Sequence, residues 1–259
     1  MESLPAERKA LLFSAGGVRL ALRLSQVREI VDVPEDAGEV TFRGTAVPGL
    51  PVAMALGLTG GRTRFGLVTE TTPRVALRVE AIHGIIELSS AEVFQLPART
   101  LLPQPAPFQG AVVSGGAIAL ELAVSSLGWV PIEPASELPG PPPELDFPLG
   151  RELLFTRGAR TYAVPVHLLA QVLDHPCVYG VPLAPSAHRG LLYHGRAIHP
   201  VFDVGVLYGE SAGEEVASAL LVEAGGNAIA VLADRILAAG DGGAREVSRP
   251  SWDALFPGP

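Results

Sequence analysis

The sequence predicts an all-β protein with minor helix, made of two copies of one module that is itself built from small barrels. Three observations predict this fold class. Short runs alternate apolar and polar side chains with a period of two, as half-buried strands do. Glycines and prolines separate these runs at turn-like spacings, and no long amphipathic helical pattern occurs. The two halves of the chain also resemble each other.

The composition fits a folded chain and argues against several functions. Of 259 residues, 48% are hydrophobic and 18% are charged, so the chain can bury a core and has room for two domains. The net charge of −8 makes nucleic acid an unsuitable partner, because an acidic surface repels phosphate. Lys9 is the only lysine, which excludes a Gly-Lys-Ser/Thr phosphate loop and disfavours a receiver domain or a Schiff-base enzyme.

Other features concern the cellular compartment. Cys177 is the only cysteine, so the chain cannot form an intramolecular disulfide or a cluster of thiolate metal ligands. The N-terminus carries acids and a proline where a secretory signal would carry basic and then apolar residues. No stretch approaches the ~18 uncharged apolar residues of a membrane span. We therefore expect a cytoplasmic protein that does not insert into a membrane.

The first half contains strand and turn signals in sequence order. Residues 20–24 alternate leucine with alanine or arginine, which predicts a half-buried strand. Serines open residues 25–31 and residues 89–94, where each could cap a helical turn or two. Residues 65–69 and 75–79 flank a Thr-Thr-Pro-Arg break and predict a hairpin.

The second half repeats these signals after a distinct spacer. Residues 131–148 concentrate prolines and acids without a basic residue, which predicts a semi-rigid extended segment. Residues 162–166 then alternate as residues 20–24 do. Residues 219–223 and 228–232 flank an Ala-Gly-Gly-Asn break and predict a second hairpin.

The halves align without gaps over their first strands and with a changed offset further on. At an offset of 142, residues 11–16 lie over residues 153–158, and the match continues through the following strand. The offset grows to 152 at Gly190 and to 154 further on. The second half therefore carries ten extra residues between Pro176 and Gly190.

Several motifs stand in one order in the first half. Residues 11–30 contain two strand patterns and a turn, and residues 38–48 contain Gly-x4-Arg-Gly-x-x-Val-Pro. Residues 75–93 and 109–127 supply later strands and short helical turns. In this order and spacing the motifs resemble the CheW-like domains, which are the coupling modules of bacterial chemosensory systems.

The same series recurs in the second half, where residues 181–204 resemble the signature and residues 232–237 resemble a later strand. The resemblance covers nearly the whole chain apart from the spacer and the termini. It implies two CheW-like domains, each a pair of small five-stranded β-barrel subdomains. Its expected divisions are a first domain at 8–130, a Pro-rich acidic linker at 131–150, a second domain at 151–240 and a tail at 241–259.

The copies depart from the family pattern in informative places. Pro51 replaces the aspartate that the second half has as Asp203, and Gly195-Arg196 replaces the Arg-Gly pair. Too few residues follow Ile236 to supply the family's closing strand, so we expect the second domain to be truncated at its C-terminal end. An open strand edge is a liability, so we expect the tail, the spacer or a partner to cover it.

The resemblance implies a non-enzymatic adaptor that uses no cofactor, metal or catalytic residue. Such an adaptor would couple a CheA-type histidine kinase, through the kinase's own CheW-like regulatory domain, to the cytoplasmic tips of chemoreceptors, with recruitment to membrane-associated receptor arrays. A scaffold for other cytoplasmic partners, outside chemotaxis, is the alternative. The implied partner-binding residues are Arg43, Gly44, Val47, Pro48, Arg196, Pro200 and Asp203.

Several of these residues have a structural alternative. Arg43 could grip a partner's carboxylate or carbonyls with its planar guanidinium, or be a surface arginine without a role. Gly44 and Pro48 could instead shape the turn and the strand entry. Asp203 and Glu80 could cap turns.

Two sharper chemical hypotheses are disfavoured. A Gly-x-Ser-x-Gly match at residues 209–213 suggests a hydrolase that uses Ser211, but that fold needs a histidine after the serine and all six histidines precede it. Five histidines between His167 and His199 suggest a metal site. Their spacings fit no helical pair, and carboxylate or thiolate partners at ligand spacing are missing.

The C-terminal tail leaves two alternatives open. Trp252 and Phe256 stand four residues apart after a serine, as on one face of a helical turn. They could form a docking motif for a partner. They could also fold back over the truncated second domain, because exposed aromatic residues would otherwise promote nonspecific association.

Overall fold

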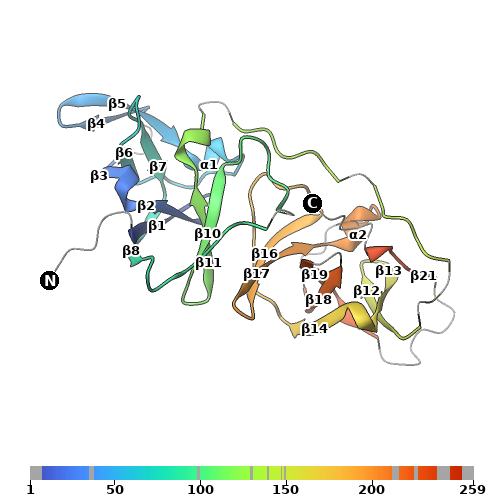
Figure 1. The fold of residues 1–259 in the computed structure, drawn as a ribbon. Helices are drawn as coiled ribbons and strands as arrows, with labels where there is room; N and C mark the ends of the chain where they lie inside the picture. The colour runs from blue at the N-terminus through green and yellow to red at the C-terminus, as the bar shows by residue number, and fades with distance from the viewer. Residues whose placement is uncertain are drawn as a thin grey trace. The chain divides into compact units, whose positions relative to one another are not determined.

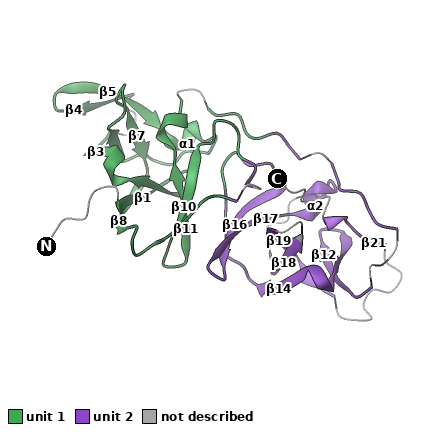
Figure 2. Ribbon diagram, in the orientation of Figure 1, with its two compact units in different colours: residues 1–96, 102–135, 181–183 green, residues 97–101, 136–180, 184–259 purple. Residues whose placement is uncertain are grey.

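The fold, seen in a computed structural model, consists of two compact units of β-strands (Figures 1 and 2). Unit 1 comprises residues 1–96, 102–135 and 181–183, and unit 2 comprises residues 97–101, 136–180 and 184–259. The predicted all-β class is confirmed. The residues that the structure describes are 8–34, 38–97, 100–128, 131–138, 140–146, 148, 150–211, 216–224, 227–237 and 246–252.

Unit 1 contains a six-stranded sheet in the order β8-β1-β2-β11-β10-β9. Its pairings are antiparallel except that of β2 with β11, which is parallel. The strands are β1 (Lys9–Ala15), β2 (Val18–Arg23), β8 (Ala81–Glu87), β9 (Glu92–Phe94), β10 (Phe108–Ser114) and β11 (Ala117–Leu122).

A five-stranded sheet completes unit 1 in the order β3-β6-β7-β5-β4. Val40, Val47 and Val68 lie in its buried core. The strands are β3 (Val27–Asp32), β4 (Glu39–Phe42), β5 (Thr45–Pro51), β6 (Phe65–Thr69) and β7 (Ala76–Val79). The short helices are η2 (Leu24–Gln26), α1 (Val52–Ala55) and η4 (Val124–Ser126).

Unit 2 repeats this plan with sheets of four and six strands, in the orders β20-β12-β13-β21 and β14-β18-β19-β17-β16-β15. The smaller sheet contains β12 (Glu152–Arg157), β13 (Arg160–Pro165), β20 (Arg235–Ile236) and β21 (Val247–Ser248). The larger contains β14 (Leu169–Asp174), β15 (Val178–Tyr179), β16 (His188–His194), β17 (Ala197–Phe202), β18 (Ser218–Ala224) and β19 (Asn227–Ala233). The helices are η5 (Val166–Leu168) and α2 (Val204–Leu207).

Strands β2 and β13 are buried on both faces, whereas their alternation predicted half-buried strands. Leu20, Ala21 and Leu22 are all fully buried, and so are Tyr162 and its neighbours. The small alanine between the large side chains allows packing on the second face. Alternation of size, and not of polarity, therefore marks these central strands.

The two predicted helical turns are mostly strands. Only Leu24–Gln26 forms a 3-10 turn, and Val27–Asp32 pairs with β6 over nearly its whole length. Residues 89–91 form turns and bends and lead into β9, which pairs with β10. Pairing with strands distant in sequence overrides the local serine signal.

The ten extra residues of the second half include an additional edge strand. Val178 and Tyr179 form β15, which pairs with Leu192 and Leu191 of β16. No strand of the described residues pairs with the outer edge of β4, the first-half counterpart of β16. The length difference between the repeats therefore changes the edge of one sheet.

The described part of the tail completes unit 2. In unit 1, β2 pairs in parallel with β11, with Leu20 opposite Leu120. In unit 2, β13 pairs in parallel with β21, with Tyr162 opposite Ser248. Tyr162 corresponds to Leu20 at the offset of 142, so β21 takes the place of β11.

Trp252, which follows β21 in the tail, packs into the core of unit 2. Its side chain is 3% exposed and joins the main apolar cluster of unit 2. Its indole Nε1 donates to the carbonyl oxygen of Ala163 at 3.1 Å. Ala163 corresponds to Ala21, which lies opposite Glu121 of β11 in unit 1. The fold-back alternative for Trp252 is confirmed, and Phe256 lies outside the described residues.

The Pro-rich spacer forms backbone hydrogen bonds with the tail. The amide of Leu145 donates to the carbonyl of Arg249 at 2.9 Å, and the amide of Ser251 donates to the carbonyl of Pro143 at 2.9 Å. An antiparallel bridge lies between these hydrogen bonds. The expectation that tail or spacer protects the open edge is thus confirmed, because both take part. None of the described helices is long and apolar enough to cross a membrane.

We expect Trp252→Ala to destabilise unit 2 by about 3–5 kcal/mol, because it leaves a cavity and removes the donor to a buried carbonyl. Urea unfolding followed by circular dichroism, with amide exchange at residues 160–164, measures the change. Val166→Ala is the control, because Val166 is 45% exposed and should change stability by less than about 0.5 kcal/mol. Wild-type stability in Trp252→Ala would show that the tail is not part of the fold.

Candidate functional site

The predicted site of unit 1 is the tip of the β4–β5 hairpin. Phe42 pairs with Thr45, so Arg43 and Gly44 form a two-residue turn with φ angles of 48° and 77°. Positive φ at both positions is the hairpin turn that matches strand twist, and it explains the glycine. Because the turn projects outward, 64% of the Arg43 side chain is exposed.

The Arg43 side chain is held in place by two neighbours. Its Nη2 lies 3.2 Å from Glu29 Oε2 on β3, and its guanidinium lies 5.2 Å from the centre of the Phe42 ring. Glu29 itself is 41% exposed in its side chain. An exposed pair of this kind contributes less than about 1 kcal/mol to stability, so it orients the guanidinium more than it stabilises the unit.

Other predicted residues of this hairpin differ in exposure. Gly44 supplies the turn, and Val47 is 4% exposed and lies in the core. Pro48 is exposed and stands opposite Glu39 in the register. Arg43 and Pro48 are thus available at the surface, whereas Val47 acts through packing.

Unit 2 forms the same turn with the residue order reversed. His194 pairs with Ala197, and Gly195 and Arg196 have φ angles of 58° and 61°. Arg196 is exposed, and Pro200 is buried opposite Leu191. What the sequence presents as a departure from Arg-Gly leaves the turn geometry unchanged, because the glycine and the arginine both adopt positive φ.

Each hairpin tip is linked to the same position of an edge strand. Gln171 Oε1 lies 2.9 Å from Nε2 of His194, and Gln171 is the counterpart of Glu29 at the offset of 142. The residues that follow, Ile30 and Val172, are 40% and 38% exposed. Sequence reasoning missed these edge-strand residues as site candidates. The alignment of the halves could have found them, since they occupy matched positions.

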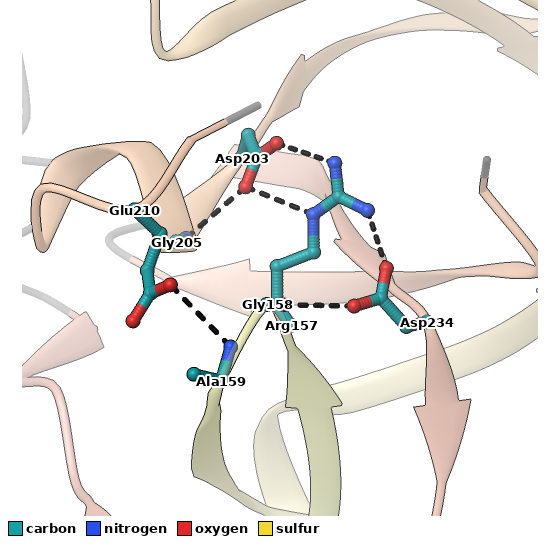
Figure 3. Close-up of polar contacts among 7 residues, drawn as sticks. All are labelled: Arg157, Gly158, Ala159, Asp203, Gly205, Glu210 and Asp234. Atoms are coloured by element: carbon teal, nitrogen blue, oxygen red, sulfur yellow. Dashed lines mark hydrogen bonds and ion pairs between the residues drawn. The ribbon is translucent and has the colours of Figure 1, made fainter. Parts of the chain in front are cut away.

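A buried ionic network lies at a different place in unit 2 (Figure 3). Arg157 is 2% exposed, and its Nε donates to Asp203 Oδ1 at 3.0 Å while Nη2 donates to Oδ2 of the same carboxylate at 2.5 Å. Its Nη1 donates to Asp234 Oδ1. The hydrogen bond with Asp203 raises the pKa of Arg157 above its usual value, against the opposing effect of burial.

The contacts of the Asp203 side chain therefore lie within unit 2. Asp203 is 1% exposed, and its Oδ1 also accepts from the amide of Gly205, so it caps α2 (Figure 3). The turn-capping alternative for Asp203 is therefore observed, and a direct contact with a partner would require the unit to open. No sequence signal pairs Asp203 with Arg157, which stands 46 positions earlier and which only the folded chain brings near.

The first repeat retains only part of this network. Asp234 Oδ2 accepts from the amide of Gly158 at 2.8 Å. Glu80, the counterpart of Asp234, accepts from the amide of Gly16 at 2.9 Å. Both acids therefore hold the same β-turn. Ala15 and Pro51 stand where unit 2 has Arg157 and Asp203, so the first repeat lacks this ion pair, and its buried charged residues, Arg78 and Glu121, lie at other positions.

The histidines do not gather around a metal position. Among the described residues no group of three potential metal ligands occurs. His188 is buried against Phe202 with both ring nitrogens without a partner, and burial lowers its pKa to about 4. His194 is linked to Gln171, as described above. Ser211 is exposed and follows Gly209 and Glu210 in the described residues, whereas Ala212 and Gly213 of its motif lie outside them.

We expect Arg157→Met to destabilise unit 2 by about 3–5 kcal/mol, because it leaves the Asp203 carboxylate buried without its cation. Combining it with Asp203→Asn removes the second charge and should recover part of the loss. Urea unfolding of both variants measures the difference. An equal or larger loss in the double variant would contradict this account of the ion pair.

We expect unit 2 to lose stability as the pH falls from about 6.5 towards 4. His188 has a folded-state pKa of about 4, so the unfolded chain binds more protons across this window. The loss approaches about 3 kcal/mol at the acidic end. Unfolding of wild type and His188→Leu across this range tests it, since the variant should lack this component. His167→Gln, at an exposed position, should retain the wild-type dependence.

Comparisons with known proteins agree with the repeated architecture. The model of the CheW-like domain family matches residues 9–128 and again residues 151–250. The second match extends beyond residue 240 and includes β21. No curated protein sequence matches the chain.

One solved structure that is similar to part of the chain is the scaffolding protein TtCheW from Thermoanaerobacter tengcongensis. The similarity covers 45% of this chain and 89% of that chain, with 18% sequence identity and a TM-score of 0.39. The two family matches together span most of the chain, and each falls on one of the two repeats. The chain therefore belongs to the CheW-like domain family and carries two such domains in tandem.

Proposed function

We propose that the chain is a non-enzymatic adaptor of a bacterial chemosensory system. It links a CheA-type histidine kinase, through the kinase's CheW-like regulatory domain, to the cytoplasmic tips of chemoreceptors. The observation that carries the proposal is the match of both repeats to the CheW-like domain. The adaptor works in the cytoplasm, at receptor arrays on the membrane.

The hairpin tips supply suitable chemistry for this role. Arg43 presents a planar guanidinium that is 64% exposed and already oriented by Glu29. A guanidinium donates to carboxylates and carbonyls in fixed geometry, and arginine is enriched where binding energy concentrates. The exposed apolar Ile30 follows Glu29 on the adjoining strand. A charged donor beside an apolar side chain is a small but specific contact surface.

Different residues of the predicted set have different roles in the proposal. Arg43 and Arg196 contact partners directly. Gly44 and Pro48 shape the first hairpin and its entry into β5, while Val47 and Pro200 pack beneath the tips. Asp203 acts at a distance, by fixing α2 and Arg157.

Two domains on one chain have a binding consequence. Once one domain is bound, the second site experiences an effective concentration set by the connecting segment, which can reach millimolar for short flexible linkers. Affinity then rises without new contacts if both sites can be engaged together. An adaptor with weak single contacts gains most from this arrangement.

A second candidate is a scaffold for cytoplasmic partners outside chemotaxis. It is favoured by the different chemistry of the two tips, an arginine–glutamate ion pair at Glu29 and a histidine–glutamine hydrogen bond at Gln171. Affinity capture from the native cell, followed by mass spectrometry, separates the candidates. A kinase and receptors support the first, and an unrelated set of partners supports the second.

We expect Arg43→Ala to weaken binding of the full chain to the kinase regulatory domain or a receptor tip by at least about tenfold, or 1.4 kcal/mol. Isothermal titration calorimetry measures it. Arg19→Ala is the matched control, because Arg19 is an exposed arginine of β2 away from the tip. Unchanged affinity in Arg43→Ala and in Arg196→Ala would remove the hairpin tips from the interface.

A further inference from the structure

The edge of β13 in unit 2 is a preformed site for an extended strand. The first repeat fills the corresponding edge with the six residues of β11, and β10 follows on its outer side. Unit 2 has β21, of two residues, in that place. The edge therefore relies on a segment whose first described residue, Glu246, lies ten positions beyond Ile236 in the sequence.

Three contacts with the repeat itself recognise the segment that fills this edge, and the spacer adds backbone hydrogen bonds from Leu145 and to Pro143. Thr161 and Tyr162 pair with β21 through the backbone. The indole of Trp252 enters the apolar core and donates to a backbone carbonyl. The guanidinium Nε of Arg249 lies 3.2 Å from Glu152 Oε2, with side-chain exposures of 24% and 10%. Together they select an extended peptide with an arginine three residues before a tryptophan.

The attachment is short compared with the rest of the sheet. β12 and β13 pair over six register positions, whereas β13 and β21 pair over two. Elements with few backbone pairs open locally at lower free energy than the whole unit unfolds. An opened tail leaves both an uncovered strand edge and an empty indole pocket, which favours refilling by an identical segment.

We propose that the tail exchanges between two copies of this chain, so that residues 246–252 of each copy fill the β13 edge of the other. The occupant is a second copy because its tail carries every group that the edge recognises, including Arg249 for Glu152 and Trp252 for the core. The ten residues between Ile236 and Val247 reach roughly 35 Å when extended. The exchange is reciprocal, so it closes as a symmetric dimer.

In the wild type, the chain's own tail competes at an effective concentration of about millimolar, which keeps the exchanged form a minority. Reversing one charge of the Arg249–Glu152 ion pair removes the advantage that the chain's own tail has over the tail of another copy. Arg249→Glu places two glutamates together within one chain, and Glu152→Arg places two arginines together. In an exchanged heterodimer of these variants, each tail meets the opposite charge. The chemistry therefore favours exchange only in the mixture.

The experiment mixes the Arg249→Glu and Glu152→Arg chains at equal concentration, about 100 µM, and weighs the species by light scattering and native mass spectrometry. We expect a heterodimer in at least about tenfold larger fraction than the homodimer of either variant alone. The chain with both substitutions restores an ion pair within one copy and should remain monomeric. Folding of each variant is checked by circular dichroism.

Three outcomes overturn the proposal. One is a mixture of folded variants that remains monomeric. Another, which applies if a variant fails to fold, is co-refolding of isotope-labelled and unlabelled wild type at millimolar concentration without any mixed dimer. Mixed dimers that persist in Trp252→Ala would also contradict it, because that chain lacks the side chain that anchors the exchanged tail. These results do not depend on which partners the adaptor binds.

Discussion

The architecture of unit 2 depends on satisfying the backbone groups along one edge of β13. A buried strand edge without partners costs free energy for every unpaired donor and acceptor. In unit 1 a complete strand, β11, meets this need. In unit 2 the need is met by β21 and by the indole of Trp252, and the spacer at Glu144 bridges to Pro250 of the same tail. Segments outside the compact repeat are thereby part of its core.

Comparison of the two repeats separates the features that fix the backbone, which recur, from the side-chain interactions that differ between the repeats. The acid that receives the turn amide recurs as Glu80 and Asp234, and both hairpin tips adopt two successive positive φ angles. These features fix the backbone. The ion pair of Arg157 and Asp203 occurs in one repeat alone, where its charges satisfy each other away from water. The hairpin tips also differ in chemistry, with an ion pair at Glu29 in one repeat and a hydrogen bond at Gln171 in the other.

Local patterns in the sequence predicted the β class, the paired hairpins and the position of the extra residues, because these depend on neighbouring side chains. The strand at Val27–Asp32 was wrongly expected to be helical, since its partner strand lies about forty residues away. At the site, too, contacts between residues that are distant in the sequence could not be predicted. The exposure of Arg43 follows from its turn, whereas the burial of Asp203 follows from Arg157, which only the folded chain brings near.

The distance in sequence between Trp252 and Ala163, 89 residues, sets an order of events during synthesis. Ribosomes add about 5–20 residues per second, so β13 exists for several seconds before its covering segment is made. Unit 1 closes its own counterpart edge earlier in translation, through β11. The wait in unit 1, from Leu20 to its partner Leu120, spans 100 residues, so in both domains a central strand edge stays open for a comparable time and slow elongation prolongs its exposure to aggregation.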